Sequence, residues 1–387
     1  MFVGSKLKDT RILHGFSRNE LALSVGVTEQ AIWQYEQNSI QPKFETLMKL
    51  SELFSVESKY YYKKNLLDHV TDENKIAYRN VDRQQKNKTI SEAYYLDFVH
   101  MILSDLNNNV QLFNNQMIMI RNIVMNKRKN GSSIEECADI VRSQLKIISN
   151  QELMLTLEKN GIIILERELF STKTDAYSTW VQEVPYIVLS SKSKSFVRRN
   201  FDLAHELGHL MLHYGEDITS LDKDDFKLIE SEANDFASSF LMPREDFLAD
   251  LSIIKGRISN PDYYIEMKKK YFVSIQAMGY NAYKLGEMSY RQNSYFFSQI
   301  NKLKMHKVEP LDMDFLVIKP KKIVSFLDYL DKNKLYSIKE MLIQYDVKVE
   351  FFSKVFGIYP EFFYERISKE VSVTELFDFK KTKKLAN

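Results

Sequence analysis

The sequence predicts a mainly α-helical protein with a small α+β core near its middle. Apolar residues recur at three- and four-residue spacing over much of the 387-residue chain, as they do on one face of a helix. Residues 161–165, Gly-Ile-Ile-Ile-Leu, instead form a short apolar run that is typical of a strand. Proline and glycine are few, at 7 and 11 residues, and 44% of the chain is hydrophobic. A chain of this length should hold two or three domains.

Residues 1–65 predict a module of four or five short helices. Ser17-x-x-Glu20 is a capping box that opens the second helix, and Gly26 supplies the turn after it. Thr28 caps a third helix, and a fourth begins after Pro42. A short helix, a tight glycine turn and a capped helix together predict a helix-turn-helix.

In a helix-turn-helix, the N-terminal half of the third helix enters the major groove of DNA. Gln30 is the best candidate for reading a base edge because glutamine can pair with adenine through two hydrogen bonds. Glu29 and Gln34 face similar directions. The candidates for phosphate contacts are Lys6, Arg11, Arg18 and Lys43. The alternative is a small helical bundle that binds protein, since the module is only weakly basic. A homodimer would double the phosphate contacts.

Residues 66–145 predict a polar helical connector. A long helix through Tyr94, Phe98, Ile102 and Leu106 shows apolar three-four spacing. This helix could dock onto the following domain or pair with a second copy of the chain.

The segment Ala204–His209 contains the pattern His-Glu-x-x-His. Residues four apart on a helix lie on one face, so His205 and His209 can offer two imidazole nitrogens to one zinc ion. Glu206 lies next to that metal and can take a proton from bound water. This combination is the apparatus of a zinc-dependent peptidase. The alternative from the motif alone is a helix with two histidines and no metal.

A catalytic zinc needs three protein ligands and one open position. A carboxylate from a following helix is a common third ligand, and Glu230 and Glu232 are both candidates. They are two residues apart, so on a helix they cannot both point at the metal. His213 lies about 12 Å along the helix from His205, too far to share a metal, and we expect it to be structural or to support a ligand. Tyr177 and Tyr214 are candidate donors to an oxyanion.

The run from Phe201 to Met242 resembles the ImmA/IrrE family of metallo-endopeptidases. The matching pieces are Phe201-x-x-Ala204-His205-Glu206-Leu207-Gly208-His209-Leu210-x-Leu212-His213, then Glu232-Ala233-Asn234-x-Phe236-Ala237, then Phe240-Leu241-Met242-Pro243. This resemblance implies a zincin-like core with a short mixed sheet, Zn²⁺ as the cofactor and Glu232 as the third ligand. It also implies an extended segment before the zinc helix, here Val184–Ser191. That segment is expected to be either an edge strand along which a substrate backbone can lie or an ordinary core strand.

The N-terminal module resembles the XRE (lambda-repressor-like) family. The usual residue pattern of that family is similar to this chain at Ala22, Gly26, Val27, Ile32, Glu36, Pro42 and Leu50. We therefore expect a DNA-binding domain (1–65), a helical connector (66–145), a zinc peptidase core (146–250), a helical extension of the peptidase (251–304) and a helical C-terminal region of unassigned role (305–387).

Together the two resemblances imply a cytoplasmic regulator that binds operator DNA and cleaves a repressor or antitoxin, or itself, to relieve repression. A protease tethered at an operator would have a high effective concentration near proteins bound there. One alternative is a repressor whose peptidase-like domain senses a signal or binds a partner without cutting, and another is a scaffold that binds no DNA.

The composition sets further limits on the kind of protein. The one cysteine, Cys137, excludes an internal disulfide and a cysteine-based zinc site, and it suits a reducing cytoplasm. The net charge of +2 says little about partners. No apolar run reaches membrane-spanning length, and the first residues do not predict a signal peptide.

Overall fold

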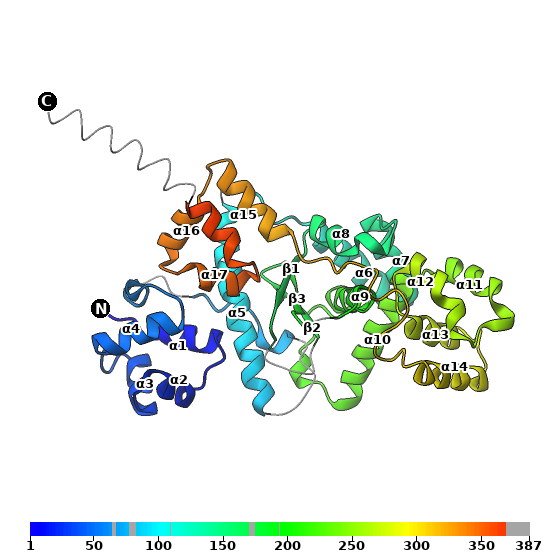
Figure 1. Ribbon diagram of the computed structural model, residues 1–387, viewed down its shortest axis with the longest axis horizontal. Coiled ribbons are helices and arrows are strands. Elements are labelled where there is room, and N and C mark those ends of the chain that lie inside the picture. The colour runs from blue at the N-terminus through cyan, green and yellow to red at the C-terminus, as the bar shows by residue number, and fades with distance from the viewer. Residues whose placement is uncertain (64–66, 77–82, 109, 170–174, 193, 369–387) are drawn as a thin grey trace.

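The computed structural model describes residues 1–63, 67–76, 83–108, 110–169, 175–192 and 194–368. It confirms a mainly α-helical protein with a small mixed sheet. Figure 1 shows the N-terminal helices at one end, the sheet in the middle and helices α11–α14 at the opposite end. The predicted C-terminal region extends to residue 387, and its part beyond Ser368 lies outside the described residues.

The N-terminal helices are α1 (Gly4–Leu13), α2 (Arg18–Val25), α3 (Glu29–Glu36) and α4 (Phe44–Leu53), followed by the 3-10 helices η1 (Ser58–Tyr62) and η2 (Glu73–Lys75). The predicted caps are confirmed. Ser17 Oγ accepts from the Glu20 amide at 3.1 Å, while Glu20 accepts from the Ser17 amide at 2.7 Å. Gly26 turns the chain with a φ of 77°, a conformation that favours glycine. Thr28 Oγ1 then accepts from the Ala31 amide at 3.2 Å and starts α3.

Helix α5 (Arg83–Asn107) is the long helix that the sequence predicts. It packs on α1, on strand β2 and on α17 of the C-terminal region. Leu96, Val99 and Leu103 on this helix are completely buried, and Ile90, Tyr94 and Met101 are partly buried. In the described part of the chain, its apolar face is therefore covered by the protein itself.

The sheet has the order β1-β3-β2, with β1 (Ile163–Arg167) parallel and β2 (Ala176–Val181) antiparallel to β3 (Val184–Ser190). Gln182 and Glu183, both with positive φ, form the two-residue turn between β2 and β3. All residues of β3 are buried. The expectation of an edge strand at Val184–Ser191 is therefore wrong and the core-strand alternative holds, because β3 pairs on both sides. The edge strands are β1 and β2.

Helices surround the zinc-motif helix α9 (Phe196–Leu212). Gly208 allows the close approach of α10 (Lys223–Leu241), since a Cβ at this position would lie 3.1 Å from the ring of Phe236. The helices before the sheet are α6 (Gln116–Lys129), α7 (Ile134–Leu145), η3 (Asn150–Glu152) and α8 (Leu153–Lys159). The remaining elements of this part are η4 (Ile218–Ser220), α11 (Arg244–Ile253), η5 (Lys255–Arg257), η6 (Pro261–Tyr264), α12 (Ile265–Tyr271), α13 (Ile275–Lys284) and α14 (Tyr290–Lys302).

The sheet separates two apolar cores. Tyr177, Tyr186 and Val188 face a core shared with the N-terminal helices, α5 and the C-terminal helices. Ile164, Ile187 and Leu189 face the core of α6–α14. The first core draws residues from four of the expected segments (1–65, 66–145, 146–250 and 305–387), and that division of the chain stays a prediction. No helix of the described residues is both long and apolar enough to cross a membrane.

The C-terminal helices α15 (Lys322–Lys332), α16 (Ile338–Tyr345) and α17 (Val349–Phe356) return to the N-terminal end of the molecule (Figure 1). Val56 and Val347 form an antiparallel bridge, and the Glu57 amide donates to the carbonyl of Asp346 at 2.8 Å. The carboxylate of Asp346 is fully buried against Lys59 and Lys63, at 3.1 and 2.6 Å. This contact fastens the C-terminal helices to the N-terminal module.

We predict that Asp346→Asn loosens this contact. Asn tolerates the positive φ of 55° at this position but carries no charge for the two lysines. Both lysines are well exposed, so we expect a loss of only about 1–2 kcal/mol. Amide hydrogen exchange in residues 55–63 should then accelerate roughly 5–30-fold. Glu361→Gln, at an exposed position on the same C-terminal region, is the control. Unchanged exchange in Asp346→Asn would show that the buried carboxylate does not hold the two segments together.

Candidate metal centre

Helix α9 presents the two histidines of the motif side by side. The Nε2 atoms of His205 and His209 face one another at 3.1 Å. Two ligands of a tetrahedral zinc, each at 2.0–2.1 Å from the ion, lie about 3.3 Å apart. The spacing of the two nitrogens therefore fits one shared metal ion.

Glu230 of α10 completes a set of three ligand atoms. Its carboxylate oxygens lie 3.8 Å from His205 Nε2 and 3.5 Å from His209 Nε2. One ligand atom from each of the three residues lies within 4.8 Å of the others. Two neutral nitrogens and one carboxylate oxygen are a donor set that zinc takes in catalytic sites, with the fourth position left to water.

Glu232 lies near the site but faces away from the two motif histidines. Its Oε1 accepts from Arg128 at 2.8 Å, and its Oε2 accepts from His213 Nε2 at 3.1 Å. The structure thus brings Glu230, and not the expected Glu232, to the ligand atoms of α9. The reason is the face of α10 that packs on α9: Ala233 and Phe236 lie in its buried stripe, and the two glutamates flank that stripe on opposite sides.

Hydrogen bonds behind the two imidazoles determine which ring nitrogen carries the proton. Asn234 Oδ1 lies 3.1 Å from His205 Nδ1, so Nδ1 donates and Nε2 keeps its lone pair. His213 donates from Nε2 to the Glu232 carboxylate and therefore accepts at Nδ1. That Nδ1 lies 3.0 Å from His209 Nδ1, which must donate, leaving His209 Nε2 unprotonated as well.

Burial supports these neutral forms, because it lowers the pKa of both His205 and His213 to about 4. Arg128, the remaining partner of Glu232, forms an ion pair with its carboxylate at 2.8 Å. The expectation that His213 supports a ligand agrees with its place in this chain of hydrogen bonds. Sequence reasoning missed Arg128 altogether, since it comes from the distant helix α6 with no motif around it.

Glu206 is almost completely buried close to His209 and Glu230. Ser178 of β2 donates to Glu206 Oε2 at 2.7 Å, which orients the carboxylate. Burial raises the pKa of Glu206 to about 7, and the nearby His209 opposes this shift. A carboxylate with a pKa near neutrality can both accept and return a proton at physiological pH. Nothing in the sequence around Ser178 indicated this role.

The two tyrosines expected to stabilise an oxyanion are both engaged elsewhere. Tyr177 lies in the core on the other side of the sheet, where its hydroxyl donates to Glu92 at 2.7 Å, so that expectation is wrong. Alternating side chains of a strand point to opposite faces, and Ser178, not Tyr177, points to α9. Tyr214 donates to Glu183 at 2.6 Å and stacks under the guanidinium of Arg121.

The residues predicted to contact DNA differ in how exposed their side chains are. Gln30 and Glu29 are exposed in the first turn of α3, Gln34 is half-buried, and Lys43 is exposed where α4 begins. Arg18 is partly exposed and pairs with the buried Glu36 at 2.7 Å.

Two of the expected phosphate contacts are wrong. Arg11 is buried on the other oxygen of Glu36, and Lys6 is buried with its Nζ bonded to the carbonyl of Tyr60. Their charges stabilise the interior of the module, which leaves fewer cations for DNA than the sequence suggested.

Comparison with known proteins agrees with both parts of the fold. A family model described as a helix-turn-helix matches residues 7–61, and one described as an IrrE N-terminal-like domain matches residues 157–283. The second match covers the sheet, α9 and α10. The HTH-type transcriptional regulator ImmR of Bacillus subtilis (strain 168) is 31% identical over 93 residues, which make up 24% of this chain and 65% of that protein. The chain therefore joins an XRE-type helix-turn-helix domain to an IrrE/ImmA-like domain of the M78 peptidase family.

Proposed function

We propose that this chain is a DNA-binding transcriptional regulator whose IrrE/ImmA-like domain is a zinc-dependent endopeptidase. The observation that carries the proposal is the convergence of His205, His209 and Glu230 beside the buried carboxylate of Glu206. Three ligands with one open position, next to a group that can accept a proton, form the arrangement of a catalytic zinc site.

In this proposal each residue has one task. His205 and His209 would hold zinc through Nε2, and Glu230 would hold it through its carboxylate. The bound zinc would lower the pKa of a water molecule and polarise the scissile carbonyl. Glu206 would accept a proton from the attacking water and return it to the leaving amine, while Ser178 holds the Glu206 carboxylate in place.

The proposed substrate is a repressor or antitoxin bound at the same operator, or another copy of this chain. The tether to a DNA-binding module raises the local concentration of the peptidase at such a site. Strand β2 is an edge strand and contributes Ser178 to the site, so an extended substrate segment could lie along it. Cleavage would relieve repression.

We predict that Glu230 and Glu232 contribute differently to zinc affinity. Purified wild-type protein should hold about one zinc per chain, and His205→Ala should lose it. Glu230→Gln removes a direct ligand and should weaken zinc far more than Glu232→Gln, for which a loss of roughly 10–100-fold is expected. Elemental analysis and competition with a chromophoric chelator measure both effects. If Glu232→Gln is instead the more damaging change, Glu232 is the ligand.

We predict that His213 acts on zinc through His209. Replacing His213 with Phe removes the acceptor for His209 Nδ1. The His209 ring can then rotate, or its proton can move to Nε2, the nitrogen that must bind the metal. Zinc affinity should fall roughly 10–100-fold with the fold intact by circular dichroism. His306→Gln, at an exposed position, is the matched control. The position of the His209 proton in the metal-free protein can be read directly by nitrogen NMR, and protonation at Nε2 in the wild type would contradict the assignment.

We predict that Glu206→Gln abolishes cleavage and keeps zinc. The amide has nearly the shape of the carboxylate but cannot accept the proton, so the rate should fall on the order of 10²–10⁴-fold. The measurement is cleavage of purified candidate repressors by the zinc-loaded protein, followed by mass spectrometry. Cleavage at the wild-type rate in the variant would remove Glu206 from the mechanism. A wild-type protein that binds zinc but cuts no candidate would favour a sensor that does not cleave.

We predict that Gln30→Ala weakens operator binding by about 1–3 kcal/mol and relaxes specificity at one base pair. Gln41→Ala, at an exposed position outside α3, should have little effect. An operator selected from random duplexes serves as the ligand in a fluorescence anisotropy titration. Affinity should also fall steeply with salt, because phosphate contacts release counterions. Absence of binding to any duplex would support a protein-binding bundle.

A further inference from the structure

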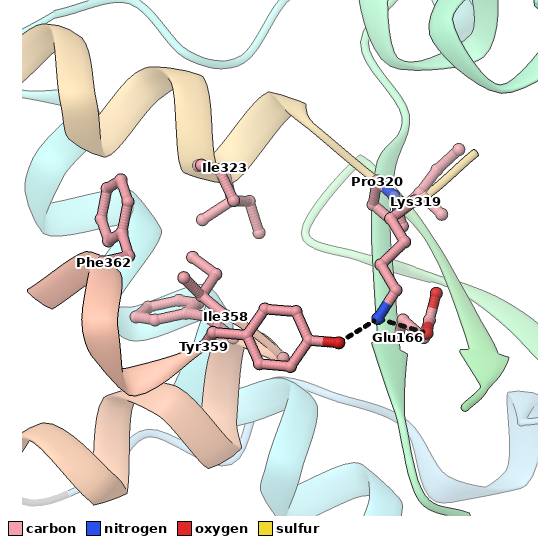
Figure 2. A pocket seen from close by; sticks show the side chains of 11 residues that line it. Glu166, Lys319, Pro320, Ile323, Ile358, Tyr359 and Phe362 are labelled. Atoms are coloured by element: carbon pink, nitrogen blue, oxygen red, sulfur yellow. Dashed lines mark hydrogen bonds and ion pairs between the residues drawn. The ribbon is translucent and has the colours of Figure 1, made fainter. Parts of the chain in front are cut away.

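A cavity of about 210 Å³ lies where the C-terminal region packs on the outer edge of strand β1. Figure 2 shows Ile323, Ile358 and Phe362 around it, with Glu166, Lys319 and Tyr359 together at one end. Its walls are mostly apolar, and Ile164, Ile323 and Ile358 are all buried. No step of the proposed peptidase chemistry uses this cavity.

Gly357 lets the C-terminal region approach β1 closely at one wall of the cavity. It follows α17 with a φ of 65°, and a side chain at this position would collide with the carbonyl oxygen of Glu166 on β1. The C-terminal region therefore touches the backbone of β1 directly on one side of the cavity. On the other side, Glu158 accepts hydrogen bonds from the amides of Lys321 and Lys322 and fixes the start of α15.

The polar end of the cavity carries an excess of positive charge. Lys319 Nζ lies 3.7 Å from a Glu166 oxygen and donates to the Tyr359 hydroxyl oxygen at 3.0 Å. Arg199 of α9 also pairs with Glu166, so two cations share one carboxylate. The three charged groups together have a net charge of +1.

Unused hydrogen-bond donors remain at this end. Lys319 has three N–H groups, of which one donates to Tyr359, while the Glu166 oxygen lies beyond hydrogen-bond distance at 3.7 Å. Tyr359 accepts from Lys319, and its own hydroxyl hydrogen has no acceptor among the described residues. The lysine side chain is 54% exposed, so this end is the mouth and the apolar walls form the interior.

We infer that this cavity binds a small monocarboxylate with an apolar tail. The tail fills the apolar interior, where water would find few partners, and the carboxylate accepts from Lys319 and Tyr359 and neutralises the excess charge. A water-sized group occupies about 30 Å³, and protein interiors pack more densely than liquids, so the volume admits roughly seven to ten non-hydrogen atoms. A nucleotide is too large and too polar for this cavity.

A ligand in this cavity would lie between the sheet beside α9 and the C-terminal helices that contact the N-terminal module. One wall belongs to the sheet next to α9, and Arg199 links Glu166 to α9 itself. The opposite walls belong to the C-terminal helices, which hold the N-terminal module through Asp346. Binding in the cavity does not depend on zinc, so this inference stands or falls apart from the proposed peptidase activity.

The test uses the full chain with its isoleucine methyl groups labelled for NMR, titrated with hexanoate. Hexanamide and hexylamine, which have the same tail with a neutral and a positive head, are the comparison ligands. We expect saturable shifts at the methyls of Ile164, Ile323 and Ile358 with hexanoate, and about tenfold weaker binding of hexanamide. Equal binding of the amide or the amine, or no saturable shift at these three methyls, would overturn the inference.

Two variants test the mouth. Lys319→Met keeps most of the side-chain stem and should weaken hexanoate about tenfold while leaving hexanamide unchanged. Tyr359→Phe should weaken hexanoate to a smaller degree, because one neutral donor is lost. Lys339→Met, an exposed lysine on α16, is the matched control and should bind like the wild type. If Lys319→Met binds hexanoate as tightly as the control does, the lysine does not recognise the carboxylate.

Discussion

The packing of α9 against α10 is the contact on which the candidate metal centre depends. Gly208 leaves room for the ring of Phe236, so the two helix axes can approach closely. That approach carries Glu230 to the Nε2 atoms of His205 and His209. A larger residue at position 208 would push α10 away, and the third ligand would leave with it. The most important residue for the geometry of this site therefore has no chemistry of its own.

A network of polar side chains around the ligands fixes their protonation as well as their positions. Asn234 Oδ1 accepts a hydrogen bond from His205 Nδ1, and His213 Nδ1 accepts one from His209 Nδ1. Each bond keeps the proton on Nδ1 and leaves Nε2 of the same ring free for a metal. The partners come from α9, α10 and α6, so the network also ties three helices together. The side chains of His209 and His213 are largely buried, and a missing partner there would cost more free energy than it would in water.

The C-terminal region connects the N-terminal helices to the sheet. It forms a bridge with the segment after α4 at Val56 and Val347, and it also packs on the edge of the sheet at Gly357. The core on that side of the sheet runs without interruption from the N-terminal helices to α17. The helix-turn-helix is thus built into the body of the protein, and Gln30 and Glu29 remain exposed on its outer surface.

The sequence by itself determined the local features. The capping box at Ser17, the turn at Gly26 and the spacing of His205 and His209 depend on neighbouring residues, and helix geometry alone converts them into structure. Only the tertiary structure decided the rest. Glu230 and Glu232 flank the same buried stripe, so the packing of α10 chooses between them, and the place of β3 in the middle of the sheet depends on its pairing with β1 and β2. Likewise Lys6 and Arg11 look like surface cations in the sequence, but their partners, Tyr60 and Glu36, are brought to them only by folding.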